Sequence, residues 1–100
     1  MARVIKKQMP FDGELAAAVP DTKRRQEIEQ GIRFALSEFP GQGVRTSRST
    51  PMPVYVWRMF RTTLNPPLVI YYCFDTQMVL LLGVRVAQED PEDDEAPRNQ

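Results

Sequence analysis

The chain has 100 residues, of which 42% are hydrophobic and 26% charged, a composition typical of one globular domain and unlike that of a disordered or fibrous chain. The formal net charge of zero hides a division: residues 1–87 hold twelve basic and seven acidic residues (+5), whereas residues 88–100 hold one basic and six acidic residues (−5). No apolar run approaches the ~18 residues of a membrane-spanning helix and no signal peptide is recognisable, so we expect a cytoplasmic protein with no membrane partner.

The N-terminal part contains one strand-like and one helix-like segment. Residues 3–9 can form a strand with Val4 as its apolar contact, and Pro10 ends it because proline lacks the N–H that a strand ladder needs. Residues 14–19 are rich in alanine and predict a short helix. Pro20 closes this helix, because the residue before a proline disfavours helical geometry.

The strongest helical pattern begins at Asp21, a good N-cap, and runs to Phe39. Four apolar residues recur at the spacing of one helix face, namely Ile28, Ile32, Leu36 and Phe39. We expect this face to pack against the core. Pro40 and Gly41 end the helix.

The C-terminal half has the pattern of a sheet. After a polar loop at 42–53, three strands are predicted at 54–62, 68–74 and 78–87, separated by a breaker at 65–67 and a turn at 75–76. They form a three-stranded antiparallel meander. The continuous apolarity of the last two strands predicts that they are central and covered on both faces, on one of them by the helix.

These elements predict an α+β fold in which one or two N-terminal helices pack on a small antiparallel sheet, with an additional strand at 3–9. We expect residues 1–87 to form this single domain. Residues 88–100 have two prolines, no periodicity and little apolar surface, so we predict an acidic disordered tail. One functional interpretation is that the tail folds onto the basic body and screens it against nucleic acid.

The residue types exclude several kinds of chemistry. The chain has no histidine, which excludes Ser-His-Asp and Cys-His catalysis and histidine metal sites. The lone cysteine, Cys73, excludes an internal disulfide and thiolate zinc clusters. The acidic run at 89–95 lacks the spacing and the glycine of a calcium loop. We therefore expect no metal and no cofactor.

The basic residues are the most suggestive chemical group. Arginine donates bidentately to phosphate and stays charged, and aromatic rings can stack on bases. The candidate nucleic-acid or target-binding residues are Arg45, Arg48, Trp57 and Arg61. The alternative is that the tryptophan packs in the core or an interface and that the arginines form a solvated surface. Tyr71 and Tyr72 are neighbours on a strand, so at most one of them lines a given site.

The predicted order of elements is a strand, a helical segment, a basic loop and a meander that contains the segments NPPLVIYYCFD and VLLLGVRVAQEDP. This order and these segments resemble the RelE/ParE superfamily of bacterial toxins from toxin–antitoxin modules. The resemblance covers residues 54–91 and, in outline, the N-terminal half. Members that cut messenger RNA on the ribosome use side chains on this sheet to activate the ribose 2′-hydroxyl and to stabilise the phosphate charge. By this resemblance the catalytic positions are Arg58, Tyr71 and Arg85.

Three positions depart from the family pattern. Leu68 stands where an arginine is usual, Val86 where a histidine or another polar residue often follows, and Glu89 where a further arginine is common. One missing electrostatic donor can lower the rate about 100-fold or more, so these departures argue against full ribonuclease activity.

The resemblance implies a divergent toxin-type protein that binds and inhibits a cytoplasmic target. The expected target is RNA, the ribosome or gyrase, and the expected partner is an antitoxin peptide or protein. Two alternatives stay open. One is an active ribosome-dependent messenger RNA endoribonuclease. The other is a non-toxic interaction or mobile-element accessory protein that forms a homodimer or a larger homo-oligomer.

Overall fold

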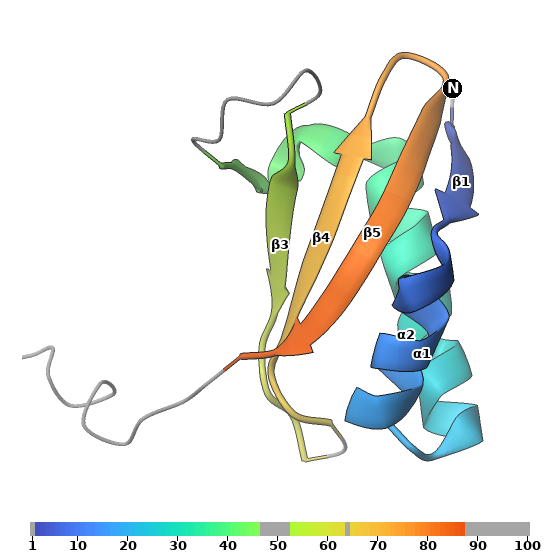
Figure 1. Cartoon of the computed structure of the whole chain (residues 1–100), viewed down its shortest axis with the longest axis vertical. Coiled ribbons are helices and arrows are strands. Elements are labelled where there is room, and N and C mark those ends of the chain that lie inside the picture. The colour runs from blue at the N-terminus through green and yellow to red at the C-terminus, as the bar shows by residue number, and fades with distance from the viewer. Residues whose placement is uncertain (1, 47–52, 64, 88–100) are drawn as a thin grey trace, which may run out of the picture.

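A computed structural model describes residues 2–46, 53–63 and 65–87 (Figure 1). Two helices pack on one face of a five-stranded sheet, which confirms the predicted α+β class. Within the described ranges, no helix has the length and apolarity needed to cross a membrane. The predicted acidic tail, residues 88–100, lies outside the described residues.

The sheet has the strand order β1-β5-β4-β3-β2. The predicted meander is confirmed in β3 (Tyr55–Met59), β4 (Leu68–Phe74) and β5 (Met78–Val86), which pair antiparallel. β1 (Val4–Lys7) runs parallel to β5, so the sheet is mixed instead of purely antiparallel. Two helices and three strands separate β1 from β5 in the chain. A long connection of this kind permits parallel pairing, whereas a tight hairpin imposes antiparallel pairing.

A fifth strand, β2 (Val44–Arg45), pairs with the start of β3 inside the segment predicted as a loop. Two residues are too few to show the alternation of a strand. The N–H of Gly43 donates to the Tyr72 hydroxyl at 3.1 Å, and this hydroxyl donates to the carbonyl of Pro40 at 2.5 Å. A Cβ on residue 43 would collide with the same hydroxyl. Tyr72 therefore fixes β2 to the centre of the sheet.

Both helices begin at residues that suit a helix N-terminus. α1 (Met9–Ala18) starts five residues before the predicted helix at 14–19, with Pro10 in its first turn, where a residue without an N–H is tolerated. α2 (Thr22–Glu38) has the predicted N-cap, because the Asp21 carboxylate accepts a hydrogen bond from the N–H of Arg24 at 3.1 Å. A 3-10 turn, η1 (Pro40–Gln42), follows α2.

The helices bury one face of the sheet in a single core. Three of the four predicted α2 residues are buried there, but Phe39 is 65% exposed. Phe39 follows the last residue of α2 with non-helical backbone angles (φ −134°, ψ 66°), which take its side chain off the helix face. The core residues of both helices and the strands are Phe11, Leu15, Val19, Ile28, Ile32, Leu36, Leu68, Ile70, Tyr72, Val79, Leu81 and Val84.

The opposite face of the sheet, called the open face here, consists of the strand residues that alternate with the core residues. No helix of the described ranges covers it (Figure 1). Val69 and Cys73 on this face are nevertheless only 8% and 5% exposed, because β3 and β5 flank β4 on its two sides. The prediction that helices or other elements cover both faces of the central strands is therefore not met within the described residues, where the helices cover one face only.

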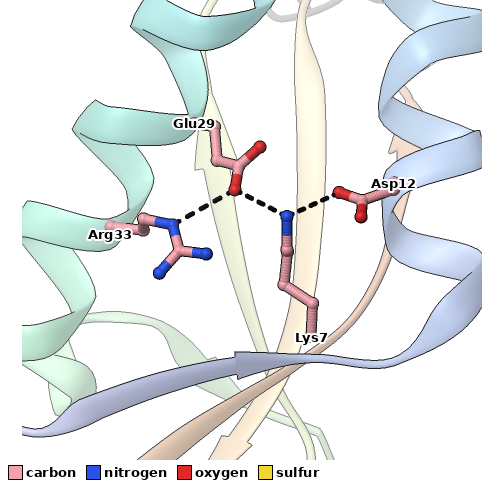
Figure 2. Close-up of polar contacts among 4 residues, drawn as sticks. All are labelled: Lys7, Asp12, Glu29 and Arg33. Atoms are coloured by element: carbon pink, nitrogen blue, oxygen red, sulfur yellow. Dashed lines mark hydrogen bonds and ion pairs between the residues drawn. The ribbon is translucent and has the colours of Figure 1, made fainter.

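Four charged side chains join β1, α1 and α2 (Figure 2). The Nζ atom of Lys7 lies 2.8 Å from Asp12 Oδ1 and 2.8 Å from Glu29 Oε2. Glu29 Oε2 also accepts a hydrogen bond from Arg33 Nε at 3.1 Å. The hydrogen bonds with Asp12 and then Glu29 raise the pKa of Lys7 above its ordinary value, against the opposing effect of burial. This network ties the N-terminal strand to both helices.

We expect Lys7→Met to lower the free energy of unfolding at pH 7 by about 1 kcal/mol, because Glu29 loses a partner in a half-buried ion pair. The folded-state pKa of Lys7 is raised. Its contribution is therefore fully present below the unfolded-state pKa of about 10.4 and is lost as the pH rises through the higher folded-state value. Urea unfolding of parent and variant should give a difference that shrinks above about pH 10.5.

Lys6→Met is the matched control, because Lys6 is the neighbouring lysine and is exposed on the open face. It should leave the free energy of unfolding at pH 7 within about 0.5 kcal/mol of the parent value. Equal losses in the two variants would contradict the role given to the network. So would a Lys7→Met deficit that persists unchanged at strongly alkaline pH.

Candidate functional site

The strand register brings two of the predicted arginines together. Val69 on β4 pairs with Arg58 on β3 and with Arg85 on β5, so the three residues form one row across the sheet. Directly paired residues share a face, and both arginines are exposed. Two strand spacings, about 10 Å, separate their Cα atoms, so one extended anionic chain can contact both guanidinium groups.

Tyr71 lies two residues from Val69 along β4 and therefore on the same face. The guanidinium carbon of Arg85 lies 5.9 Å from the centroid of the Tyr71 ring, within cation–π distance. Arg58, Tyr71 and Arg85 thus share one surface, called the open-face cluster here. Tyr72 is buried in the core, on the other face from Tyr71.

A β-bulge in β5 places Arg85 on this surface. The register between β4 and β5 shifts by one after Leu81, so that Leu82 is an extra residue without a partner on β4. If the register continued unbroken, Arg85 would pair with Leu68, which is fully buried. The bulge therefore turns Arg85 out to the open face and Val84 into the core.

Glu14 of α1 holds the bulge. Its Oε1 atom accepts a hydrogen bond from the backbone N–H of Val84 at 2.7 Å. β1 ends at Lys7, so this carboxylate replaces the acceptor that a longer edge strand would provide. A Cβ on residue 83 would lie 2.7 Å from the same oxygen, so this close approach requires Gly83.

A hollow of about 380 Å³ lies beside the bulge, between the start of α1 and β5. It is lined by Pro10, Glu14, Tyr71, Leu82, Gly83 and Arg85. A carboxylate, a phenol and a guanidinium group therefore meet at the rim of the open-face cluster. Arginine can bind a phosphate there, and the carboxylate can accept a hydrogen bond from a donor group.

Sequence reasoning missed Glu14, because its contact with β5 joins residues 70 positions apart in the chain. The one sequence signal is Gly83 inside an otherwise apolar strand pattern, which is typical of a bulge or a close backbone approach.

Trp57 does not join the open-face cluster. It pairs with Ile70 and packs against the core, on the helix side of the sheet. Its neighbour Arg58 points to the open face, as alternation along a strand requires. Trp57 and Arg58 therefore cannot contact the same base from one face of the sheet.

The other predicted binding residues lie apart from the cluster. Arg45 pairs with Tyr55, which packs against the core, so Arg45 is also on the helix side of the sheet. Arg61 is exposed beyond the end of β3. Arg48 lies outside the described residues.

Two of the three positions that depart from the toxin pattern also face the helix side. Leu68 is fully buried in the core, and Val86 pairs with it. Basic or polar side chains at these two positions would not lie in the open-face cluster in this register. Glu89, the third position, lies outside the described residues.

The open face is basic. Lys6 pairs with Leu80 and adds an exposed positive charge to those of Arg58 and Arg85. The described strand residues of this face include no carboxylate, and Glu14 reaches only its rim from α1. Across residues 2–46, 53–63 and 65–87, no three His, Cys, Asp or Glu side chains gather where they could hold a metal ion.

Comparisons with protein-family models, with curated proteins and with solved structures found no match for this chain. The arginines and Tyr71 project from three adjacent strands, a rigid support that holds their spacing. Their chemistry suits contact with phosphates and with the planar groups of a nucleic acid.

We expect Gly83→Ala to lower the free energy of unfolding by about 1–2 kcal/mol, because the new Cβ displaces the Glu14 carboxylate and leaves the Val84 N–H without its acceptor. Gly31→Ala is the matched control, because a Cβ at this position of α2 meets nothing within 4 Å. It should stabilise the protein by about 0.5–1 kcal/mol through helix propensity. Thermal or urea unfolding measures both.

A double-mutant cycle assigns the Gly83→Ala effect to its contact. In a Glu14→Ala background, Gly83→Ala should cost less than about 0.5 kcal/mol, because the carboxylate that it displaces is already gone. The same cost in both backgrounds would show that Glu14 does not hold the bulge.

Proposed function

We propose that this chain is a divergent RelE/ParE-like toxin-type protein that binds and inhibits a cytoplasmic target through the open face of its sheet, without full ribonuclease activity. The open-face cluster is the observation that carries the proposal, since Arg58 and Arg85 flank Val69 and Tyr71 lies beside Arg85. The order of a strand, two helices and a terminal meander also agrees with the order that the resemblance to these toxins implies.

The chemistry of the open-face cluster favours RNA over gyrase as the target. Two arginines whose Cα atoms lie about 10 Å apart can each contact a backbone phosphate, and Tyr71 offers an aromatic ring beside Arg85. A protein target would favour an apolar centre with a polar rim. On the open face the strongly exposed apolar residues, Val4 and Val44, lie on the two edge strands, whereas Arg58 and Arg85 flank the central strand β4.

Cleavage of RNA needs more groups than this face offers. The 2′-hydroxyl must lose its proton to a base while donors stabilise the charge on the phosphate. Glu14 is the one carboxylate that lines the hollow, and its Oε1 atom already accepts the N–H of Val84. Its position opposite Tyr71 and Arg85 makes an endoribonuclease the second candidate, behind a binding inhibitor.

A partner of this chain would cover apolar side chains outside the open face. Phe34 and Phe39, at the C-terminal end of α2, are 70% and 65% exposed. An antitoxin peptide that wraps the helices would bury them, as amphipathic segments do in hydrophobic grooves. In a non-toxic accessory protein, the same side chains together with Phe60, which is 82% exposed, would form a homodimer interface.

The test is binding of a fluorescein-labelled, mixed-sequence single-stranded RNA, followed by anisotropy over a range of salt concentrations. We expect Arg58→Gln and Arg85→Gln each to weaken binding about three- to tenfold and to reduce the salt slope by about one, the effect of losing one phosphate contact. Lys23→Gln is the control, because Lys23 is exposed on α2, away from the sheet. It should leave the slope unchanged.

Induced expression in bacteria distinguishes the candidate functions. Growth arrest with intact messenger RNA, relieved by Arg58→Gln and Arg85→Gln, is the outcome expected of a binding inhibitor. Growth arrest with cleaved messenger RNA, relieved by Glu14→Gln, would establish the ribonuclease instead. Normal growth together with a concentration-dependent oligomer in sedimentation would replace both with the accessory protein.

A further inference from the structure

The open face and the C-terminal segment carry opposite charges. Lys6, Arg58 and Arg85 give the described strand residues of the open face three positive charges without a carboxylate among them. Residues 88–100 have a net charge of −5. Their six carboxylates belong to Glu89, Asp90, Glu92, Asp93, Asp94 and Glu95. The segment and the face are therefore electrostatically complementary.

The chain leaves the sheet beside the open-face cluster. The backbone N–H of Ala87 donates to the carbonyl of Pro67 at 2.9 Å, which fixes the end of β5 against the start of β4. Ala87 follows Arg85 by two residues, and the row of Arg85 across the sheet also contains Arg58. The acidic segment therefore starts within about 11 Å of Arg85, three residues along the chain.

The segment is long enough to cross the sheet. Its 13 residues can extend over at most about 43 Å, whereas β5 and β3 lie about 10 Å apart. Its first carboxylates can return over Arg85, and the later ones can reach Arg58. Because the segment is covalently attached, its effective concentration at the face is of the order of millimolar.

We propose that residues 88–100 dock on the open face of their own chain, through carboxylate–guanidinium contacts with Arg85 and Arg58, and compete there with an anionic ligand. Residues 88–100 lie outside the described part of the chain, whereas the face that would receive them is described. Docking rests on charge and connectivity alone, whereas competition with RNA rests on the proposed function.

Docking of this kind makes the face selective. Each exposed carboxylate–guanidinium contact is weak and screened by salt, so the segment exchanges readily. A polyanion with many phosphates can displace it, whereas a short or weakly charged anion cannot. With the segment docked, only ligands of high negative charge density would therefore bind to the open face.

The test uses the full chain with the six carboxylates neutralised and every described residue unchanged. The substitutions are Glu89→Gln, Asp90→Asn, Glu92→Gln, Asp93→Asn, Asp94→Asn and Glu95→Gln. Backbone amide spectra of the parent and the neutralised chain are compared at about 20 mM and about 500 mM salt. At low salt we expect chemical-shift differences around Arg58, Tyr71 and Arg85, and at high salt we expect them to vanish.

Two further comparisons assign the shifts to the arginines. In a background with Arg58→Gln and Arg85→Gln, the parent segment and the neutralised segment should give the same spectra on β3, β4 and β5. In a Lys23→Gln background, which removes one positive charge from α2, the differences should persist. Differences that survive the loss of both arginines would overturn the proposed contacts.

RNA binding gives a separate readout. The neutralised chain should bind the labelled single-stranded RNA about tenfold more tightly at low salt, the gain expected when a face occupied about nine-tenths of the time becomes free. If the spectra differ but neither chain binds RNA, docking stands and the RNA role fails. Identical spectra at low salt would overturn docking whatever the RNA result. Shifts that grow with protein concentration would overturn it in favour of docking on a second copy.

Discussion

One extra residue in β5 determines which side chains the sheet offers to solvent. Because Leu82 has no partner on β4, Val84 joins the core and Arg85 joins the open face. In a regular ladder Arg85 would pair with Leu68 on the helix side of the sheet, and Val84 would leave the core for the open face. The packing of the core and the composition of the candidate site thus depend on the same irregularity, which Glu14 holds by accepting a hydrogen bond from the N–H of Val84.

The bulge depends in turn on the shortness of β1. This strand pairs only with the first half of β5, and the N–H of Gln8 continues the pairing to the carbonyl of Leu81. Beyond that point α1 lies along β5 in place of a strand, so a side chain can supply the acceptor where the ladder is irregular. The ion pairs of Lys7 with Asp12 and Glu29 hold both helices close to the end of β1. A helix that covers the edge also protects it from pairing with other chains.

Periodicity predicted α2, because burial of one face imposes a period on the residues of a helix. The meander was predicted instead from apolar and β-branched runs separated by turn signals. Side-chain alternation applied to β3 would have predicted that Trp57 and Arg58 point to opposite faces. The grouping of Arg58 with Tyr71 and Arg85 came from resemblance, since no local pattern gives the register between strands. The bulge could not be predicted from the sequence for a further reason. It depends on Glu14, 70 residues away from its partner, and only Gly83 marks it in the sequence.

The adjacent lysines of β1 have different roles: one is paired with carboxylates inside the fold, and the other is exposed on the open face. Lys7 points toward the helices and is partly buried, and two carboxylates neutralise it there. Lys6 points to the open face, as Arg58 and Arg85 do. Two positive charges about 10 Å apart in water repel by only about 0.4 kcal/mol, so an exposed face can hold them at little cost to stability. Positive charge that folding does not need to neutralise, held at fixed spacing on rigid strands, is therefore free to select an anionic partner.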